Sequence, residues 1–222
     1  MKSVMVIAPH PDDETLGCGG VIQRFKSENV NVYWLIVTSI DQSDGYSEEF
    51  AKNRKQEIND VSSHYKFNKV FNLNFPTSML DTVPFNNIVT AISGALSEVK
   101  PDTLFIPHYG DIHTDHRIVF DACMSSIKWF RQKTVKKVMS YETLSETNFS
   151  NNIENNTFNP NTYYDISNYI DSKIKGMNIF RTEIDKHPFP RSEDSIRSLA
   201  KIRGSESGYE YAEAFMLIRE II

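Results

Sequence analysis

The 222-residue sequence lacks several features that would place it in a broad class. It has only two cysteines, Cys18 and Cys123, which follow no paired metal-binding spacing, so we expect both to be buried and reduced. No apolar run approaches the roughly 20 residues that a membrane-spanning helix needs, and the N-terminus lacks the apolar core of a signal peptide. The net charge of −5 argues against a general nucleic-acid binder. These absences favour a cytoplasmic enzyme or binding protein.

Apolar runs of strand length alternate with segments of helical spacing. The length suits one large domain with a real core, so we treat residues 1–222 as a single domain. The expected strands are Val4–Ala8, Val30–Thr38, Lys69–Phe75, Thr103–Pro107, Lys137–Glu142 and Ala214–Glu220. The expected helices include one capped by Ser47, one over Phe85–Val99 and one that begins near Ile118. This alternation predicts an α/β fold, a mostly parallel sheet with helices on both faces.

One polar stretch breaks this alternation. Residues Ser145–Asp165 are rich in asparagine, serine and threonine and show no strong periodicity. This composition predicts a long surface loop that can hold short strands, and not a linker between domains.

The stretch "APHPDDETLGCGG" (Ala8–Gly20) follows the first expected strand directly. In such sheets ligands gather outside the carboxyl ends of the strands, where His10, Asp12 and Asp13 would lie. The structural alternative is a solvated loop that caps a helix with acids. The prolines around His10 make the turn stiff, which suits groups that must be held in place. A dinucleotide loop is not indicated because G-x-G-x-x-G is absent, so we expect the glycines to serve helix packing.

A second cluster, "PHYGDIHTDHR" (Pro107–Arg117), follows the fourth expected strand. It holds three of the six histidines and two aspartates. If this strand is parallel to the first, both clusters meet at one edge and could hold a metal. Imidazole and carboxylate ligands without a thiolate cluster fit zinc or iron better than magnesium or calcium. His116 is the better second histidine because it opens an apolar helix, and two histidines with one carboxylate leave room for water.

The paired motifs "PHPDDE" and "HTDHR" resemble those of the PIG-L/LmbE-like de-N-acetylases. These are zinc hydrolases on a Rossmann-like sheet that remove acetyl groups from N-acetylglucosamine units. The resemblance extends to "NRKQE" (Asn53–Glu57) and to the closing "GYEYAEAF" (Gly208–Phe215), so it spans most of the chain. The sequence is also similar to family members of bacterial surface-polysaccharide pathways.

The resemblance implies roles by motif position. Zn²⁺, with Fe²⁺ as the alternative, would be held by His10, Asp13 and His116. Asp12 would be the general base. His113 would stabilise the oxyanion or protonate the leaving amine, and Asp115 would orient it and favour its charged form. Such an arrangement is chemically sensible, because zinc lowers the pKa of a bound water to about 7 and a positioned carboxylate can take its proton.

Two arginines are candidates for binding the substrate. The resemblance suggests that Arg54 reaches polar groups of the substrate, although the spacing to Glu57 equally indicates a plain ion pair within a helix. Arg191, in the stiff turn "KHPFPRS", could meet a phosphate or a sugar hydroxyl. Relatives place an aspartate after the third strand to grip the sugar, where this chain has Thr77 or Pro76, while Asp81 comes later.

The sequence thus predicts a metal-dependent N-deacetylase acting on an amino sugar that is free, nucleotide-linked or glycan-linked. The alternatives are a hydrolase of another acylated or formylated amine and a catalytically silent sugar-binding homologue. The sequence assigns no role to His108, His187 or Asp81, and it does not indicate the oligomeric state.

Overall fold

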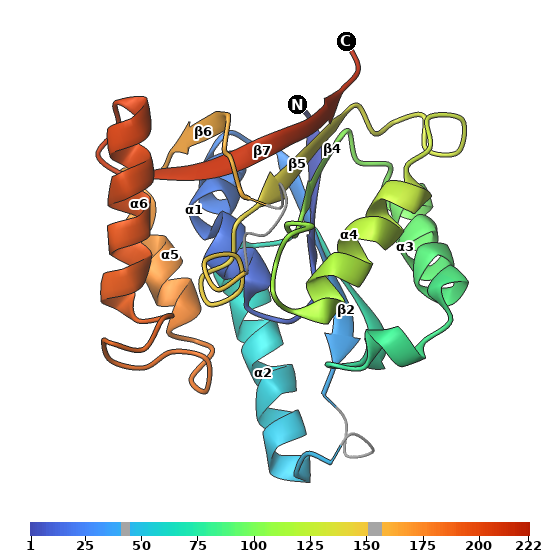
Figure 1. Cartoon of the computed structure of the whole chain (residues 1–222), viewed down its shortest axis with the longest axis horizontal. Helices are drawn as coiled ribbons and strands as arrows, with labels where there is room; N and C mark the ends of the chain where they lie inside the picture. Colours follow the sequence, from blue (N-terminus) through green and yellow to red (C-terminus); the bar gives the residue numbers. More distant parts are fainter. Residues whose placement is uncertain (41–44, 151–156) are drawn as a thin grey trace.

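The computed structural model describes residues 1–40, 45–150 and 157–222. Its centre is one sheet in the order β3-β2-β1-β4-β5-β7-β6 (Figure 1). The strands are β1 (Ser3–Ala8), β2 (Asn31–Ser39), β3 (Lys69–Pro76), β4 (Thr103–Ile106), β5 (Lys137–Tyr141), β6 (Thr162–Asp165) and β7 (Ala212–Glu220). The pairs among β1 to β5 are parallel, whereas β7 is antiparallel to both β5 and β6. The mostly parallel α/β sheet is therefore confirmed.

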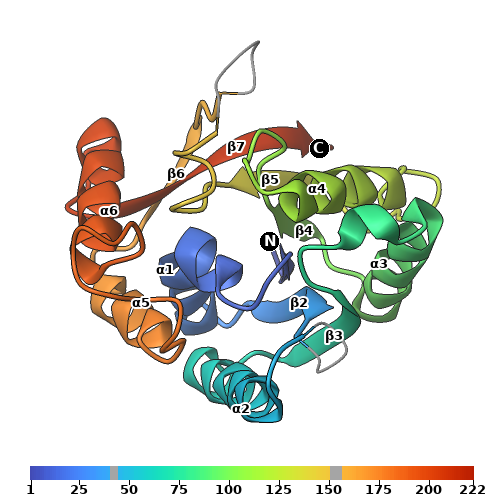
Figure 2. The same ribbon diagram turned by 60° about the horizontal axis from the view of Figure 1, so that its bottom comes forward.

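Helices cover both faces of this sheet. They are α1 (Asp13–Ser27), α2 (Glu48–Tyr65), α3 (Phe85–Val99), α4 (Thr114–Ser126), α5 (Ile170–Met177) and α6 (Glu193–Ser207), with a short 3-10 helix, η2 (Leu80–Thr82). One apolar core joins the sheet to α1, α2, α5 and α6, and the other joins it to α3 and α4 (Figure 2). Among the described residues, no helix is long and apolar enough to cross a membrane.

The expected elements are confirmed with small shifts at their ends. The six expected strands are present, and the helix over Phe85–Val99 has the expected bounds. Ser47 caps α2 because its hydroxyl accepts the N–H of Phe50 at 3.1 Å. Both cysteines are free and buried, as expected.

β6 is a short strand inside the polar stretch, in agreement with the expected loop that can hold short strands, and residues 151–156 of that stretch lie outside the described residues. The helices differ more from the expectation. α5 and α6 were not expected, and α4 begins at Thr114 rather than near Ile118.

The glycines after the first motif let α1 pack closely, as expected. A Cβ atom at Gly17 would collide with the ring of Tyr141 on the sheet. A Cβ atom at Gly19 would lie 2.6 Å from the hydroxyl of Tyr65 on α2, so the close packing extends to neighbouring helices as well. A larger side chain at either position would push α1 away from its neighbours.

A buried ion pair also fixes α1. Glu213 of the "AEAF" motif accepts the N–H groups of Gly20 and Val21 at 2.9 and 2.7 Å. It pairs with Lys173, which also donates to the carbonyl of Leu16. Both charged side chains are almost fully buried, so this pair anchors the helix that carries Asp13 at its N-terminus.

Candidate metal and catalytic site

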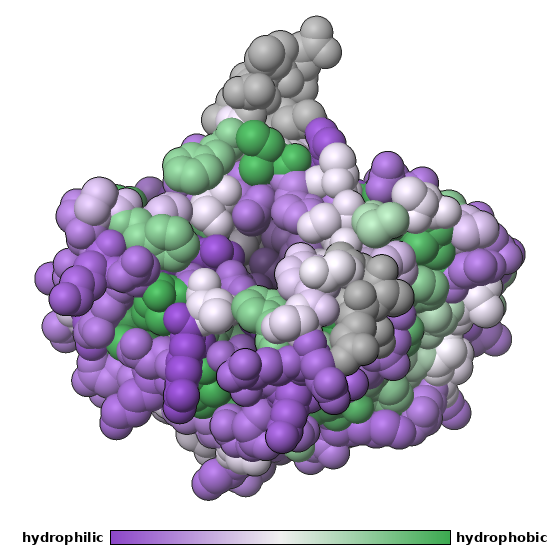
Figure 3. Space-filling model, turned by 90° about the horizontal axis from the view of Figure 1, so that it is seen from below, coloured by the Kyte–Doolittle hydropathy of each residue, from purple (hydrophilic) through white to green (hydrophobic). Residues whose placement is uncertain are grey.

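Two loops meet at the carboxyl edge of the sheet because β1 and β4 are parallel neighbours. The first motif follows β1 and the histidine cluster follows β4. Between them lies a pocket of about 180 Å³, whose lining includes His10, Asp12, Asp13, Arg54, Thr77, Ser78, His113, His116, Thr143, Glu146, Glu183 and Arg191. The molecule is hollowed at this place when seen from that edge (Figure 3). Apart from Asp115, every residue assigned a site role from the sequence lines this pocket.

Three ligand atoms converge on the wall of the pocket. Oδ2 of Asp13 lies 3.4 Å from Nδ1 of His10 and 3.3 Å from Nε2 of His116. Nε2 of His116 is buried and has no hydrogen-bond partner within the described part of the chain. One carboxylate and two imidazoles around an unsatisfied buried nitrogen form a donor set that suits a divalent transition-metal ion. These residues therefore fit the expected metal.

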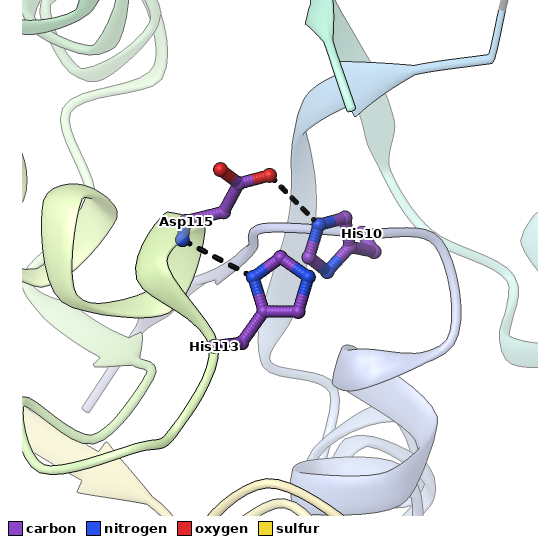
Figure 4. Close-up of side chains that lie close together, drawn as sticks. All are labelled: His10, His113 and Asp115. Atoms are coloured by element: carbon purple, nitrogen blue, oxygen red, sulfur yellow. Dashed lines mark hydrogen bonds and ion pairs between the residues drawn. The ribbon is translucent and has the colours of Figure 1, made fainter. Parts of the chain in front are cut away.

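The ring nitrogens that face away from this point are held by carboxylates. His116 donates from Nδ1 to Asp111 at 2.8 Å, and His10 donates from Nε2 to Asp115 at 3.0 Å (Figure 4). Such carboxylates fix the tautomer and orientation of metal-binding histidines. Their own positions are fixed too, since Thr147 donates to Asp111 at 2.6 Å.

A second trio, His10, His113 and Asp115, also lies within coordination reach (Figure 4). In this trio the hydrogen bond between His10 and Asp115 occupies Nε2 of His10, and Nδ1 of His113 accepts the backbone N–H of Asp115 at 3.1 Å. Because those atoms are already bonded, the trio with Asp13 and His116 is the better cation site.

The charges of the first trio support one another. Although burial favours the neutral acid, His116 and His10 hold the pKa of Asp13 well below its usual range. Burial opposes the charged form of His10, but Asp115 and Asp13 raise its pKa to about 9. The carboxylates at this point therefore favour a positive charge beside them, and a bound cation would supply it.

The structure corrects the expected relation between Asp115 and His113. The carboxylate of Asp115 contacts His10 and also accepts the N–H groups of Ser78 and Leu80 at 2.7 and 3.2 Å. His113 receives only the backbone N–H of Asp115. Burial, together with His10 and His116, lowers the pKa of His113 to about 4. His113 is therefore neutral near pH 7, and because Nδ1 is an acceptor, its proton is on Nε2.

Asp12 is held in an unusual backbone conformation beside this trio. Its φ of 136° lies where non-glycine residues are rare, and such strain typically costs about 1–3 kcal/mol. Glu14 supports the turn by accepting the N–H of Asp12 at 3.1 Å. Burial, with Asp13 and Glu183, raises the pKa of Asp12 to about 7, against the opposing effect of Arg191 and Arg54. A carboxyl with that pKa is suited to proton transfer near neutral pH.

A network of two arginines and a glutamate closes the other side of the pocket. Arg191 donates to Asp12 at 3.2 Å and pairs with Glu183 at 3.1 Å. Glu183 also pairs with Arg54. Arg54 is only 4% exposed and further donates to the carbonyl of Pro11 at 3.1 Å, next to Asp12.

The two arginines therefore differ in what they offer a substrate. The guanidinium of Arg54 is engaged by protein groups, including Glu57 at 3.3 Å, so the ion pair expected as the alternative is present. Arg54 nevertheless lines the pocket, so its contact with the substrate stays a prediction. Arg191 borders the pocket, as expected for the turn that carries it, and it is more exposed than Arg54.

Several residues near the site were missed or left without a role. Glu183 belongs to no motif in the sequence, and Asp111 has no predicted role although it is part of the histidine cluster. His108 is fully buried and packs against Tyr109 and Phe158. Asp81 and His187 are exposed and do not line the pocket.

The sequence and the fold match known proteins. A family model described as PIG-L, GlcNAc-PI de-N-acetylase, matches residues 5–127. A diacetylchitobiose deacetylase of Thermococcus kodakarensis is 24% identical over 234 residues, which cover 98% of this chain and 84% of that protein. The family match includes both motifs that build the pocket.

Two solved structures share the fold over the full chain. A conserved protein of Thermus thermophilus superposes with a TM-score of 0.81 and 24% identity, covering 100% of this chain and 97% of that one. The 4-carboxy-2-hydroxymuconate hydratase of Pseudomonas putida has a TM-score of 0.78 and 13% identity, with 100% and 98% coverage. Since a hydratase shares it, the fold alone does not determine the reaction.

Proposed function

Because the chain belongs to the PIG-L family of GlcNAc-PI de-N-acetylases, we propose that it is a metal-dependent hydrolase of an N-acetylated amino sugar. The observation that carries this proposal is the convergence of His10, Asp13 and His116 beside Asp12 in one pocket. The similarity to a diacetylchitobiose deacetylase supports an acetylated sugar as the substrate. The reaction breaks the amide C–N bond and gives acetate and a free amine.

The metal would be held by His10, Asp13 and His116. A divalent ion bound there polarises the acetamide carbonyl and lowers the pKa of a water molecule bound to it. Zinc fits this donor set, and iron is the alternative because the same ligands suit both.

Asp12 is the general base. It takes a proton from the attacking water while the oxygen of that water bonds to the acetyl carbon. Its strained turn and its bond to Arg191 fix the carboxylate at the pocket wall, so little reorganisation is needed at the moment of attack.

His113 stabilises the developing oxyanion. Its neutral ring presents Nε2–H as a hydrogen-bond donor, since Nδ1 is occupied by the backbone of Asp115. A neutral imidazole is a poor source of a proton for the leaving amine. Asp12, which has gained a proton during attack, returns it to the nitrogen as the C–N bond breaks.

Arg191 is the residue on the base side that a substrate can reach. It holds Asp12 in the required place, and its partly exposed guanidinium can donate hydrogen bonds to the hydroxyl oxygens of a sugar. Arg54 acts indirectly, because it holds the Pro11 carbonyl and Glu183.

Acetate release from N-acetylglucosamine and its derivatives tests the proposal. We expect release that stops after chelation and returns when zinc or ferrous iron is added to the stripped protein. A parallel panel of N-formyl and N-acyl amines without a sugar should react far more slowly. Acetate release that survives complete metal removal would contradict the metal dependence. Equal rates on the acyl amines would instead indicate a hydrolase of another acylated or formylated amine.

A further inference from the structure

A larger hollow of about 490 Å³ lies beside the catalytic pocket, between α2 and the segment that follows α5. Phe50, Asn53, Gln56 and Asp60 line it from α2, and Asn178 and Arg181 line it from the other side. Figure 2 shows α2 next to α5. No step of the proposed reaction uses this groove.

The groove adjoins the catalytic pocket. Arg54 borders both of them, and Thr182 in the groove precedes Glu183 in the pocket. Tyr46 in the pocket stacks on Phe50 in the groove, with ring centroids 5.4 Å apart and an angle of 16° between the rings. The shared arginine and these adjoining residues place the groove directly beside the pocket.

The lining of the groove suits uncharged hydroxyl groups. The amides of Asn53, Gln56 and Asn178 can each donate and accept hydrogen bonds. The ring of Phe50 adds an apolar surface against which the C–H face of a pyranose can be buried. Arg54 forms a rigid part of the wall, because it is 4% exposed and held by Pro11, Glu57 and Glu183.

The charges in the groove do not favour an anionic carrier. The acids Glu57 and Asp60 balance the cations Arg54 and Arg181, and Arg54 is already paired with two glutamates. A nucleotide diphosphate needs an excess of donors and positive charge, which this groove does not offer. A neutral ligand is the better match.

We propose that this groove binds the neutral sugar units of an oligosaccharide whose acetylated residue lies in the catalytic pocket. The pocket, at about 180 Å³, is the smaller space, and the groove of about 490 Å³ provides room for the units that follow. The proposal rests on the proposed function and specifies its substrate class: a glycan of two or more sugars rather than a free or nucleotide-linked monosaccharide.

The test fills the groove with a side chain from an exposed position. Asn53→Trp places an indole there, and Asn53→Ala removes one amide. Asn59, also exposed on α2, does not line the groove and borders a different hollow of about 260 Å³ toward β2 and β3. Asn59→Trp and Asn59→Ala are therefore matched controls that distinguish the groove from this other hollow. The substrates are N-acetylglucosamine and its β-linked dimer and tetramer, assayed by acetate release from the metal-loaded protein.

We expect kcat/KM of the unsubstituted protein to rise at least about tenfold from monomer to tetramer, as several added hydrogen bonds allow. In Asn53→Trp, kcat/KM for the tetramer should lie within about twofold of kcat/KM for the monomer. In Asn53→Ala, kcat/KM should fall about threefold for the tetramer alone. The Asn53 variants should keep their kcat/KM for the monomer, and both Asn59 variants should keep their kcat/KM for every substrate. No preference for length, or a loss in the Asn59 variants instead, would overturn the groove proposal while leaving deacetylation of the monomer intact.

Binding provides a readout that does not depend on turnover. Calorimetric titration of the acetylated tetramer into the Asp12→Asn chain should give an affinity at least about tenfold higher than in Asp12→Asn with Asn53→Trp. Equal affinities in the two chains, or no binding in either, would exclude the groove as a sugar site. Absence of acetate release from every substrate, with this difference in binding retained, would instead contradict the proposed function.

Discussion

On one side of the catalytic pocket, His10 and His116 are held by Asp115 and Asp111, which are fully buried. On the other side, Asp12 pairs with Arg191, whose side chain is 22% exposed and whose second partner, Glu183, is also partly exposed. The first side keeps its geometry through buried hydrogen bonds, and the second depends on ion pairs that solvent and substrate can reach.

This difference separates two functions within one pocket, metal binding and proton transfer. The metal side resembles a closed coordination shell, in which a lost partner leaves a buried group without compensation. On the base side, Arg191 and Glu183 can adjust when a substrate enters, because partly exposed ion pairs are individually weak, while the backbone turn keeps Asp12 in place. Variants on the metal side should therefore lose the metal, and variants on the base side should keep the metal and lose rate.

The largest effect is expected from His116→Ala. Without this imidazole the cation site has two ligands left, so metal content should fall far below one ion per chain. Acetate release should fall by about 10³-fold or more, since the metal supplies several kcal/mol of transition-state stabilisation. Metal analysis and the acetate assay check both effects, with exposed His187→Ala as the control. Full metal content in His116→Ala would contradict the claim that this side of the pocket holds the metal.

A smaller effect is expected from Asp111→Asn, which weakens the support of His116 without removing a ligand. Metal affinity should fall about 10- to 100-fold, as is typical when the group behind a metal-binding histidine is changed. Competition with a chelator of known affinity measures it. Asp121→Asn, at an exposed position of α4, should leave the affinity as it is. An unchanged affinity in Asp111→Asn would show that this carboxylate does not orient His116.

On the base side, Arg191→Met should leave the metal content unchanged and lower kcat/KM about tenfold. The reason is that Asp12 loses a charge-assisted hydrogen bond, although its backbone turn remains. Arg197→Met is the matched control, since Arg197 pairs with Asp171 and Glu193 away from the pocket. Metal loss in Arg191→Met would show that metal binding also depends on the base side of the pocket.

The smallest effect is expected from Glu183→Gln. The amide can still accept a hydrogen bond from Arg191 or Arg54, but the attraction between opposite charges is lost. We expect kcat/KM to fall about threefold with full metal content, measured beside Glu193→Gln as the control. A fall as large as that of Arg191→Met would show that Glu183 acts on more than the position of Arg191.

The sequence predicted the metal side far better than the base side. His10 and Asp13 belong to one short motif after a buried strand, and His116 belongs to a second one, so strand order alone brought them together. Strand order does not predict which residue the side chain of Asp115 contacts. His113 stands only two positions before it in the sequence, but the side chain of Asp115 contacts His10, about a hundred positions away along the chain.

The base side depends on contacts that have no local pattern. Glu183 and Arg191 come from an irregular segment between α5 and α6, and neither of those helices was expected. α5 has only 8 residues, which is too short to show a clear apolar period. Arg54 was found by motif, yet its direction toward Pro11 and Glu183 follows from packing between distant elements.

The most direct test of the account is the metal content and acetate release of Asp12→Asn, compared with Asp81→Asn at an exposed position outside the pocket. We predict one metal ion per chain in both proteins, and a fall in kcat of about 10²- to 10⁴-fold in Asp12→Asn alone, as expected for loss of a general base. An Asp12→Asn protein that keeps its metal and releases acetate at the unsubstituted rate would contradict the account.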